Sequence, residues 1–242
     1  MPLLRDTDLT AAFEHAAASY DLMVAGNPGY HGQLRRSARR LGLRDGGRGA
    51  RLLDLGCGTG ASTRALLTAA PYAGITAVDA SAGMLAKAAA KTWPPAVSFV
   101  HATAEGLAGA GVTGPYDAVF ASYLFRNVTD PDAVLRRVRD LLAPRGRVVV
   151  HEYALSGRPA HRALWTAVCR GLLVPVARCS GDGPLYEHLW RSVVDFDTAG
   201  AFAARMTHAG FAGVRVLPLP GWQTGIAHTF VAHLPVSGGA TR

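Results

Sequence analysis

The sequence predicts an α/β fold whose sheet is mostly parallel and is flanked by helices. From about residue 50, runs of β-type residues alternate with helical runs, which is typical of parallel strands joined by right-handed crossovers. The last two extended runs, 213–219 and 225–234, have no helix between them, so we expect an antiparallel pair at the sheet edge. A glycine-rich loop follows the first strand, where open α/β sheets bind ligands.

Capping and breaking residues set the boundaries of the elements. Ser81 and Asp130 are expected N-caps because their side-chain oxygens can accept a backbone N–H, and Pro131 suits the first helical turn. Pro71 ends the first crossover helix, and Gly146 closes the helix that Asp130 opens. The expected strands are 51–55, 75–79, 97–102, 116–122, 147–154, 213–219 and 225–234, and the expected helices are 61–70, 81–91, 130–144 and 198–211.

Two regions lie outside this alternation. Residues 1–49 are expected to form N-terminal helices, and residues 155–197 a small, mostly helical substrate cap. The cofactor-binding domain then consists of residues 50–154 and 198–236. Four aromatic residues either wall a lipophilic pocket or fill the core of the cap, namely Trp165, Tyr186, Trp190 and Trp222.

Composition excludes several classes of protein. The chain has 242 residues, 49% hydrophobic and 17% charged, which is typical of an ordinary globular protein rather than a disordered one. Arg5, Asp6 and Asp8 stand where a secretory signal would have its apolar centre, and no run of about 18 apolar residues occurs, so we expect a cytoplasmic protein. The three cysteines have no metal-ligand spacing, so no metal site is expected.

The net charge of +8 raises nucleic acid as a partner. Arginines cluster at positions 35, 36, 39, 40, 44, 48 and 51. No aromatic residues alternate with them to form a stacking platform, so we interpret the cluster as a solvated helix face and disfavour nucleic acid as a partner. An RNA-binding protein, or one with a different activity on the same fold, remains the alternative.

The loop Asp54-Leu55-Gly56-Cys57-Gly58-Thr59-Gly60 is suited to a nucleotide-like cofactor, because its glycines let the backbone approach a ligand at a helix N-terminus. With Asp79 it also fits a loose dinucleotide fingerprint. Asp54 argues against that reading, because its carboxylate would repel a pyrophosphate. S-adenosylmethionine, which carries an ammonium and a sulfonium, suits this site better.

The motif D-L-G-C-G-T-G (54–60) followed by V-D-A-S (78–81) resembles the class I S-adenosylmethionine-dependent methyltransferases. The resemblance implies a Rossmann-like, seven-stranded, mostly parallel sheet with an antiparallel edge strand. It places Asp54 and the loop glycines by the methionine moiety, Asp79 at the ribose hydroxyls and Thr103 near the adenine, where the family has an acidic or amide residue. The implied cofactor residues are Asp54, Gly56, Cys57, Gly58, Gly60, Asp79, Ala80, Met84, Thr103, Ala104 and Ser122.

The segment ASYLFRNVTD (121–130) narrows the acceptor. It has neither the Asn/Asp-Pro-Pro-aromatic stretch of methyltransferases that act on nucleobase amines nor a cysteine nucleophile. Together with FEHAAASYDLM (13–23) and AARMTHAGFAGVRV (203–216), it resembles the ubiquinone/menaquinone-biosynthesis C-methyltransferase family over most of the chain. The resemblance implies a small-molecule acceptor, aromatic and quinone-like, while C- or O-methylation of a natural product stays open.

Four residues are candidates for the chemistry. C-methylation of a hydroquinone needs a phenolate, whose developing charge Arg126 could stabilise while Asn127 and Tyr20 orient the ring. His151 ends the fifth strand where the family usually has an apolar residue, so it is either a general base or a wall histidine. The segment 161–178 either contacts a membrane surface, to reach a prenylated quinone, or packs within the cap. The sequence does not indicate an oligomeric state.

Overall fold

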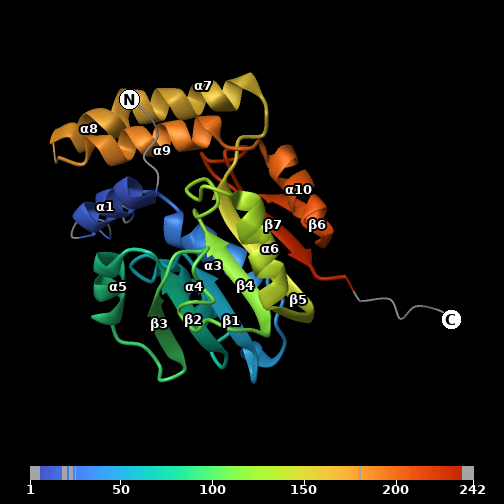
Figure 1. Cartoon of the computed structure of the whole chain (residues 1–242). Coiled ribbons are helices and arrows are strands. Elements are labelled where there is room, and N and C mark those ends of the chain that lie inside the picture. Colours follow the sequence, from blue (N-terminus) through green and yellow to red (C-terminus); the bar gives the residue numbers. More distant parts are fainter. Residues whose placement is uncertain (1–5, 18–20, 22–23, 25, 180, 236–242) are drawn as a thin grey trace.

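The computed structural model describes residues 6–17, 21, 24, 26–179 and 181–235, and in helix α1 it describes side chains from Asp8 onward. A seven-stranded sheet forms the centre of the molecule, in the order β3-β2-β1-β4-β5-β7-β6 (Figure 1). Its strands are β1 (Arg51–Leu55), β2 (Gly74–Asp79), β3 (Val97–His101), β4 (Tyr116–Ser122), β5 (Leu142–Tyr153), β6 (Ala212–Pro218) and β7 (Ala227–His233). The predicted Rossmann-like fold is confirmed.

The late strands form the predicted antiparallel pair. β7 runs antiparallel to both of its neighbours, β5 and β6, and lies between them, so β6 is the edge strand. β5 begins earlier than expected, because Leu142 already pairs with Tyr116 before the ladder resumes at Arg147. The residues between are accommodated by a register shift, and a Cβ on Gly146 would lie 2.7 Å from the carbonyl oxygen of Ala143.

Helices cover both faces of the sheet and one of its ends (Figure 1). The flanking helices are α3 (Tyr30–Arg39), α4 (Ala61–Ala69), α5 (Ala82–Ala89), α6 (Pro131–Leu141) and α10 (Ala199–His208). Beyond them lie α1 (Asp6–Ala16), α7 (Pro159–Val168), the π-helical turn η2 (Cys169–Leu173), α8 (Val174–Cys179) and α9 (Gly183–Asp195), and a 3-10 turn, η1 (Asp45–Gly47), precedes β1. The predicted caps form, since Ser81 accepts from Met84 N and Asp130 from Ala133 N.

Alternation along the strands gives each face its own hydrophobic core. Leu53 of β1 belongs to the core under α6 and α10, whereas Leu52 belongs to the core under α3 and α4. Both side chains are buried, as expected for a parallel sheet with two covered faces. The sheet is therefore a rigid platform, and the loops at the carboxyl ends of its strands are held in fixed positions. No helix in the described part of the chain is long and apolar enough to cross a bilayer.

Candidate active site

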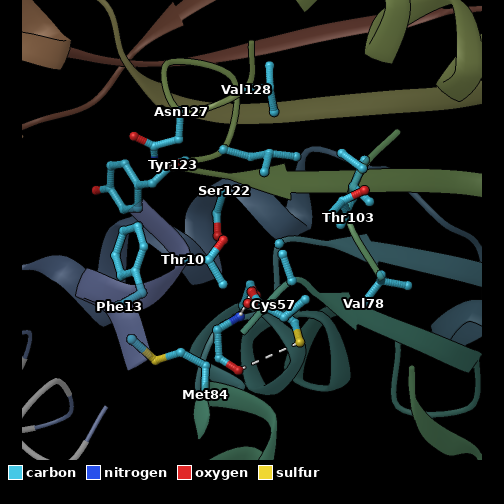
Figure 2. Close-up of a pocket in the computed structure, with 18 of the residues that line it drawn as sticks. Thr10, Phe13, Cys57, Val78, Met84, Thr103, Ser122, Tyr123, Asn127 and Val128 are labelled. Carbon is cyan, nitrogen blue, oxygen red and sulfur yellow. Dashed lines mark hydrogen bonds between the residues drawn. The ribbon is translucent and has the colours of Figure 1, made fainter. Parts of the chain in front are cut away.

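A pocket lies at the carboxyl ends of β1, β2 and β4. It contains about 1110 Å³ not filled by protein atoms, its open mouth included. Figure 2 shows the rings of Phe13 and Tyr123 on one side of this pocket and the side chains of Val78 and Thr103 on the other. The predicted cofactor residues that line it are Gly56, Cys57, Gly58, Asp79, Ala80, Met84, Thr103, Ala104 and Ser122.

The glycine loop forms the floor of the pocket. Gly56, Gly58 and Gly60 have φ values of 77°, 54° and 91°, which side chains rarely adopt. A Cβ on Gly58 would meet no atom within 4 Å, so this residue faces open space through which a ligand can approach. A Cβ on Gly60 would lie 2.7 Å from the Trp93 ring, so Gly60 is required by packing and does not line the pocket.

Asp79 joins the loop to the end of β2. Its two carboxylate oxygens accept from Gly58 N at 2.7 Å and from Ser81 N at 2.9 Å. Burial raises the carboxyl pKa, although these backbone hydrogen bonds lower it. Each oxygen retains a lone pair, so Asp79 can also accept from ligand hydroxyls in the pocket that it lines.

Asp54 lies behind the loop and does not line the pocket. Its Oδ2 accepts from Ser62 Oγ at 2.8 Å and Thr63 Oγ1 at 2.6 Å, which fixes the first turn of α4. Its Oδ1 is buried and has no hydrogen-bond partner among the described residues. Burial raises the carboxyl pKa to about 7. Asp54 therefore supports the start of α4 from behind the loop. The direct contact between Asp54 and the cofactor that the sequence predicts stays a prediction.

The pocket fits S-adenosylmethionine. No side chain caps the N-terminus of α4, whose residues Ala61 and Ser62 line the pocket, so backbone N–H groups there suit the carboxylate of the methionine moiety. Asp79 suits the ribose hydroxyls, and the apolar side chains of Val78 and Met84 suit the adenine. Thr103 is also on this wall, where its Oγ1 accepts from Gly106 N at 3.0 Å.

Helix α1 closes one side of the pocket, which the sequence did not predict. Leu9, Thr10 and Phe13 of this helix line the pocket. Glu14 accepts from Ser81 Oγ at 2.6 Å and from Gly83 N at 2.8 Å, so it caps the N-terminus of α5 from another helix.

Asp21 makes a second attachment of the N-terminal region. It accepts from Thr59 Oγ1 at 2.5 Å and pairs with Lys91 Nζ at 2.6 Å. The glycine loop and the N-terminal region are thus joined by a carboxylate. Tyr20, the predicted helix-borne tyrosine, lies outside the described residues.

Arg126 and Glu152 form a buried ion pair beside the pocket. Arg126 Nη1 lies 2.5 Å from Glu152 Oε1, and both side chains are almost fully buried. Burial raises the pKa of Glu152, and the Arg126 charge opposes that rise. Arg126 lines the pocket, and its buried Nε has no hydrogen-bond partner among the described residues.

Asn127 connects the pocket to the cap. Its Nδ2 donates to the Tyr123 carbonyl at 2.9 Å, and its Oδ1 lies 3.1 Å from His188 Nε2 of α9. None of the described residues of 155–197 lines the pocket itself. Trp165 is fully buried in the core under α3 and α4, where its ring packs on Tyr153 and its Nε1 donates to the Trp190 carbonyl. The segment 155–197 therefore contacts the pocket wall through α9.

His151 does not line the pocket but lies directly behind Tyr123, which does. Its Nε2 is 2.8 Å from the Tyr123 hydroxyl, and its Nδ1 is 2.8 Å from Ser37 Oγ, which in turn lies 2.7 Å from Thr229 Oγ1. Burial lowers the pKa of the imidazole to about 3, so it is neutral at physiological pH.

Tyr123 occupies the pocket wall next to His151. Its ring stacks between Tyr30 and Tyr153, with centroid distances of 5.7 Å and 4.6 Å. Its φ of 55° is unusual for a non-glycine residue and turns the chain sharply after β4. The sequence offered one signal for this residue, a tyrosine three residues before the Arg-Asn motif.

Part of the arginine cluster has structural roles. Arg40 donates to the carbonyls of Leu217 and Pro218. Arg51 donates to the carbonyls of Thr113 and Pro115. The exposed members include Arg35, Arg36 and Arg39 of α3.

Comparisons with known proteins agree with this geometry. Residues 53–148 match a family model described as a methyltransferase domain. The chain is 33% identical over 233 residues to a demethylmenaquinone methyltransferase of Mycolicibacterium paratuberculosis, covering 94% of each chain. It is 31% identical over 218 residues to a ubiquinone/menaquinone biosynthesis C-methyltransferase of Syntrophotalea carbinolica, covering 88% of this chain and 90% of the other.

The chain belongs to the class I S-adenosylmethionine-dependent methyltransferases. It is an enzyme, and S-adenosylmethionine is its cofactor. Two solved structures share the fold, each with a TM-score of 0.66. One is the methyltransferase bound to the Trm112 activator of Haloferax volcanii, 16% identical, covering 96% of this chain and 99% of the other. The other is the plantazolicin methyltransferase BamL solved with SAH, 13% identical, covering 94% and 97%.

Proposed function

We propose that this methyltransferase transfers a methyl group to a ring carbon of a reduced, quinone-like phenol. The observation that carries the proposal is the almost fully buried guanidinium of Arg126, which belongs to a pocket-lining residue and is held in place by the ion pair with Glu152. The names of its relatives support this acceptor class, since they act on demethylmenaquinone or in quinone biosynthesis.

The cofactor supplies an electrophilic methyl group on sulfur. An aromatic carbon attacks it readily only when a neighbouring hydroxyl has lost its proton, because the phenolate oxygen feeds electron density into the ring. Arg126 would hold that oxygen and lower the pKa of the acceptor hydroxyl by charge. Glu152 fixes the guanidinium in one orientation through the ion pair, and Asn127 fixes the loop by donating to Tyr123.

Tyr123 is proposed to donate a hydrogen bond to the acceptor. It lines the pocket, and its hydroxyl is oriented by His151 at 2.8 Å. His151 is off the pocket and its pKa lies near 3, so it is a poor proton acceptor at neutral pH. We therefore assign His151 as a positioning residue that acts through Tyr123, and not as the general base that was one of the two roles left open by the sequence.

The proposal is tested with methyl-labelled S-adenosylmethionine and three acceptors in parallel: a prenylated naphthohydroquinone, the same compound oxidised to the quinone, and bulk RNA. We expect label in the hydroquinone alone, with carbon NMR placing the new methyl on the ring. A methyl on oxygen would convert the reaction to O-methylation at the same Arg126 site. Label in RNA, or none in any acceptor, would refute the assignment.

A further inference from the structure

The outer face of α7, η2 and α8 exposes apolar side chains. Leu164, Leu172 and Val176 are 43%, 59% and 62% exposed, and Tyr72, on the opposite side of the fold, is the fourth large hydrophobic residue exposed in the described chain. All three lie on the side of the run that faces away from the fold, because the residues facing the fold are buried, namely Trp165, Cys169, Val174 and Ala177. Isolated exposed apolar residues are ordinary, but three on one short segment form a patch.

All charged side chains of the same segment are basic. Arg158, Arg162, Arg170 and Arg178 are exposed, and residues 155–179 contain no aspartate or glutamate. Arg170 lies over the Trp190 ring, and Arg178 pairs with Glu187 at 3.5 Å. Arg158 and Arg162 make no ion pair with any described side chain. Arginines and apolar residues therefore alternate on a surface that no acidic residue of the segment neutralises.

This combination selects its partner by charge. A symmetric contact with a second copy would bring like charges together, which opposes association. A layer of anionic headgroups above acyl chains complements both parts of the face, because the arginines meet phosphates while Leu164, Leu172 and Val176 enter the boundary region. We propose that the outer face of α7–α8 docks onto a membrane surface that contains anionic lipids.

Helix α9 lies between the docking face and the pocket. α9 packs against α7 and α8 and touches the N-terminal helix α1 (Figure 1). Through His188 it also contacts Asn127 of the pocket at 3.1 Å. Docking through α7–α8 would therefore hold the acceptor pocket close to the bilayer, where a lipophilic acceptor is concentrated. The inference does not depend on which acceptor is methylated.

The test is flotation of the full chain with vesicles of phosphatidylcholine alone or mixed with phosphatidylglycerol. We expect binding to the mixed vesicles, weakened by salt, and little to the neutral ones. The variant pairs Leu172→Ser/Val176→Ser and Arg158→Glu/Arg162→Glu should each lower partitioning about tenfold. All four positions are exposed, and circular dichroism would verify that the variants fold.

Matched controls separate this face from general surface properties. Tyr72→Ser removes a large exposed hydrophobic side chain that lies outside the segment. Arg35→Glu/Arg39→Glu, on α3, changes the net charge by the same amount as Arg158→Glu/Arg162→Glu. Both controls should retain binding. No binding to anionic vesicles, or an equal loss in the α3 pair, would overturn the proposal. So would light scattering that shows a dimer broken by Leu172→Ser/Val176→Ser without any change in lipid binding. None of these measurements requires methyl transfer, so they stand apart from the proposed function.

Discussion

The cofactor side and the acceptor side of the pocket are built from different kinds of contact. On the cofactor side, backbone N–H groups take part in the contacts, as when Gly58 N and Ser81 N both donate to the Asp79 carboxylate. On the acceptor side, buried side chains meet across long stretches of sequence, as in Ser37 with His151 and Asn127 with His188. A backbone site binds one cofactor in any member of a family, whereas a side-chain site can change its acceptor by a few substitutions.

The two sides also differ in charge. Asp54 and Asp79 are carboxyls whose burial raises their pKa, and hydrogen bonds from hydroxyls and N–H groups offset that rise. Arg126 and Glu152 are instead a buried ion pair, in which removal of one partner leaves an uncompensated charge. Mutations on the acceptor side therefore affect folding and chemistry together, and experiments there need paired variants.

The largest effect is expected for Arg126. Arg126→Met should lower turnover about 10²–10³-fold, because the developing phenolate loses its positive partner, with unchanged affinity for the cofactor. The single variant should also be destabilised by about 3–5 kcal/mol, since Glu152 is left buried and unpaired. The double variant Arg126→Met/Glu152→Gln should regain stability but not turnover. Steady-state kinetics and calorimetry with S-adenosylhomocysteine measure both, and equal loss of turnover and affinity would remove the assigned role.

A smaller effect, confined to the cofactor side, is expected for Asp79. Asp79→Ala should weaken cofactor binding about ten- to hundredfold, because the ribose hydroxyls and Gly58 N lose their acceptor. Asp195→Ala, at an exposed carboxylate of α9, is the matched control and should bind normally. Calorimetric titration decides, and unchanged binding in Asp79→Ala would exclude the carboxylate from the cofactor site.

Tyr123→Phe should lower kcat about tenfold while the ring stack and the cofactor affinity persist, because only the hydroxyl is removed.

With a pKa near 3, His151 should contribute no step to the pH–rate profile between about pH 6 and 8. A rate that rises through the ordinary histidine pKa, and loses that rise in His151→Gln, would restore His151 as a base.

The last prediction concerns the pH dependence of stability and not activity. The Asp54 pKa of about 7 lies above the ordinary carboxyl value, so its protonated form stabilises the fold. This contribution is complete below the unfolded-state pKa of about 4 and is lost as pH rises through about 7. In Asp54→Asn, denaturant unfolding should show a fall in stability over that range that is smaller by up to about 4 kcal/mol. An unchanged slope would mean that Asp54 is ionised in the folded protein.

The sequence predicts some parts of the fold and of the site and not others, and the kind of contact that forms each part decides which. The strands, the caps at Ser81 and Asp130 and the pocket-lining residues around Gly58 and Asp79 were predictable, because each depends on neighbours close in sequence or on a known spacing. The order of β7 inside β6 was not, because antiparallel pairing alone does not fix which strand is inner.

The other features that the sequence did not predict depend on partners that are far apart in the chain. Glu14 reaches α5 from a separate helix, and Tyr123 gains its role from His151 in another strand. Gly60 belongs to the predicted motif, yet its conformation is explained by Trp93 rather than by a ligand. Motif spacing identifies such residues without distinguishing contact with the cofactor from support behind it.

The position of Trp93 gives the protein an intrinsic optical probe. Its indole packs on Gly60 of the cofactor loop, beneath Arg64 at 4.2 Å. The other tryptophans belong to or pack against the core under α3 and α4, namely Trp165, Trp190 and Trp222. Arg64 lies on α4, so any ligand that tightens this loop alters the surroundings of this fluorophore. In a chain where Trp165, Trp190 and Trp222 are replaced by phenylalanine, its emission would follow cofactor arrival and product departure in stopped-flow time, with no added dye.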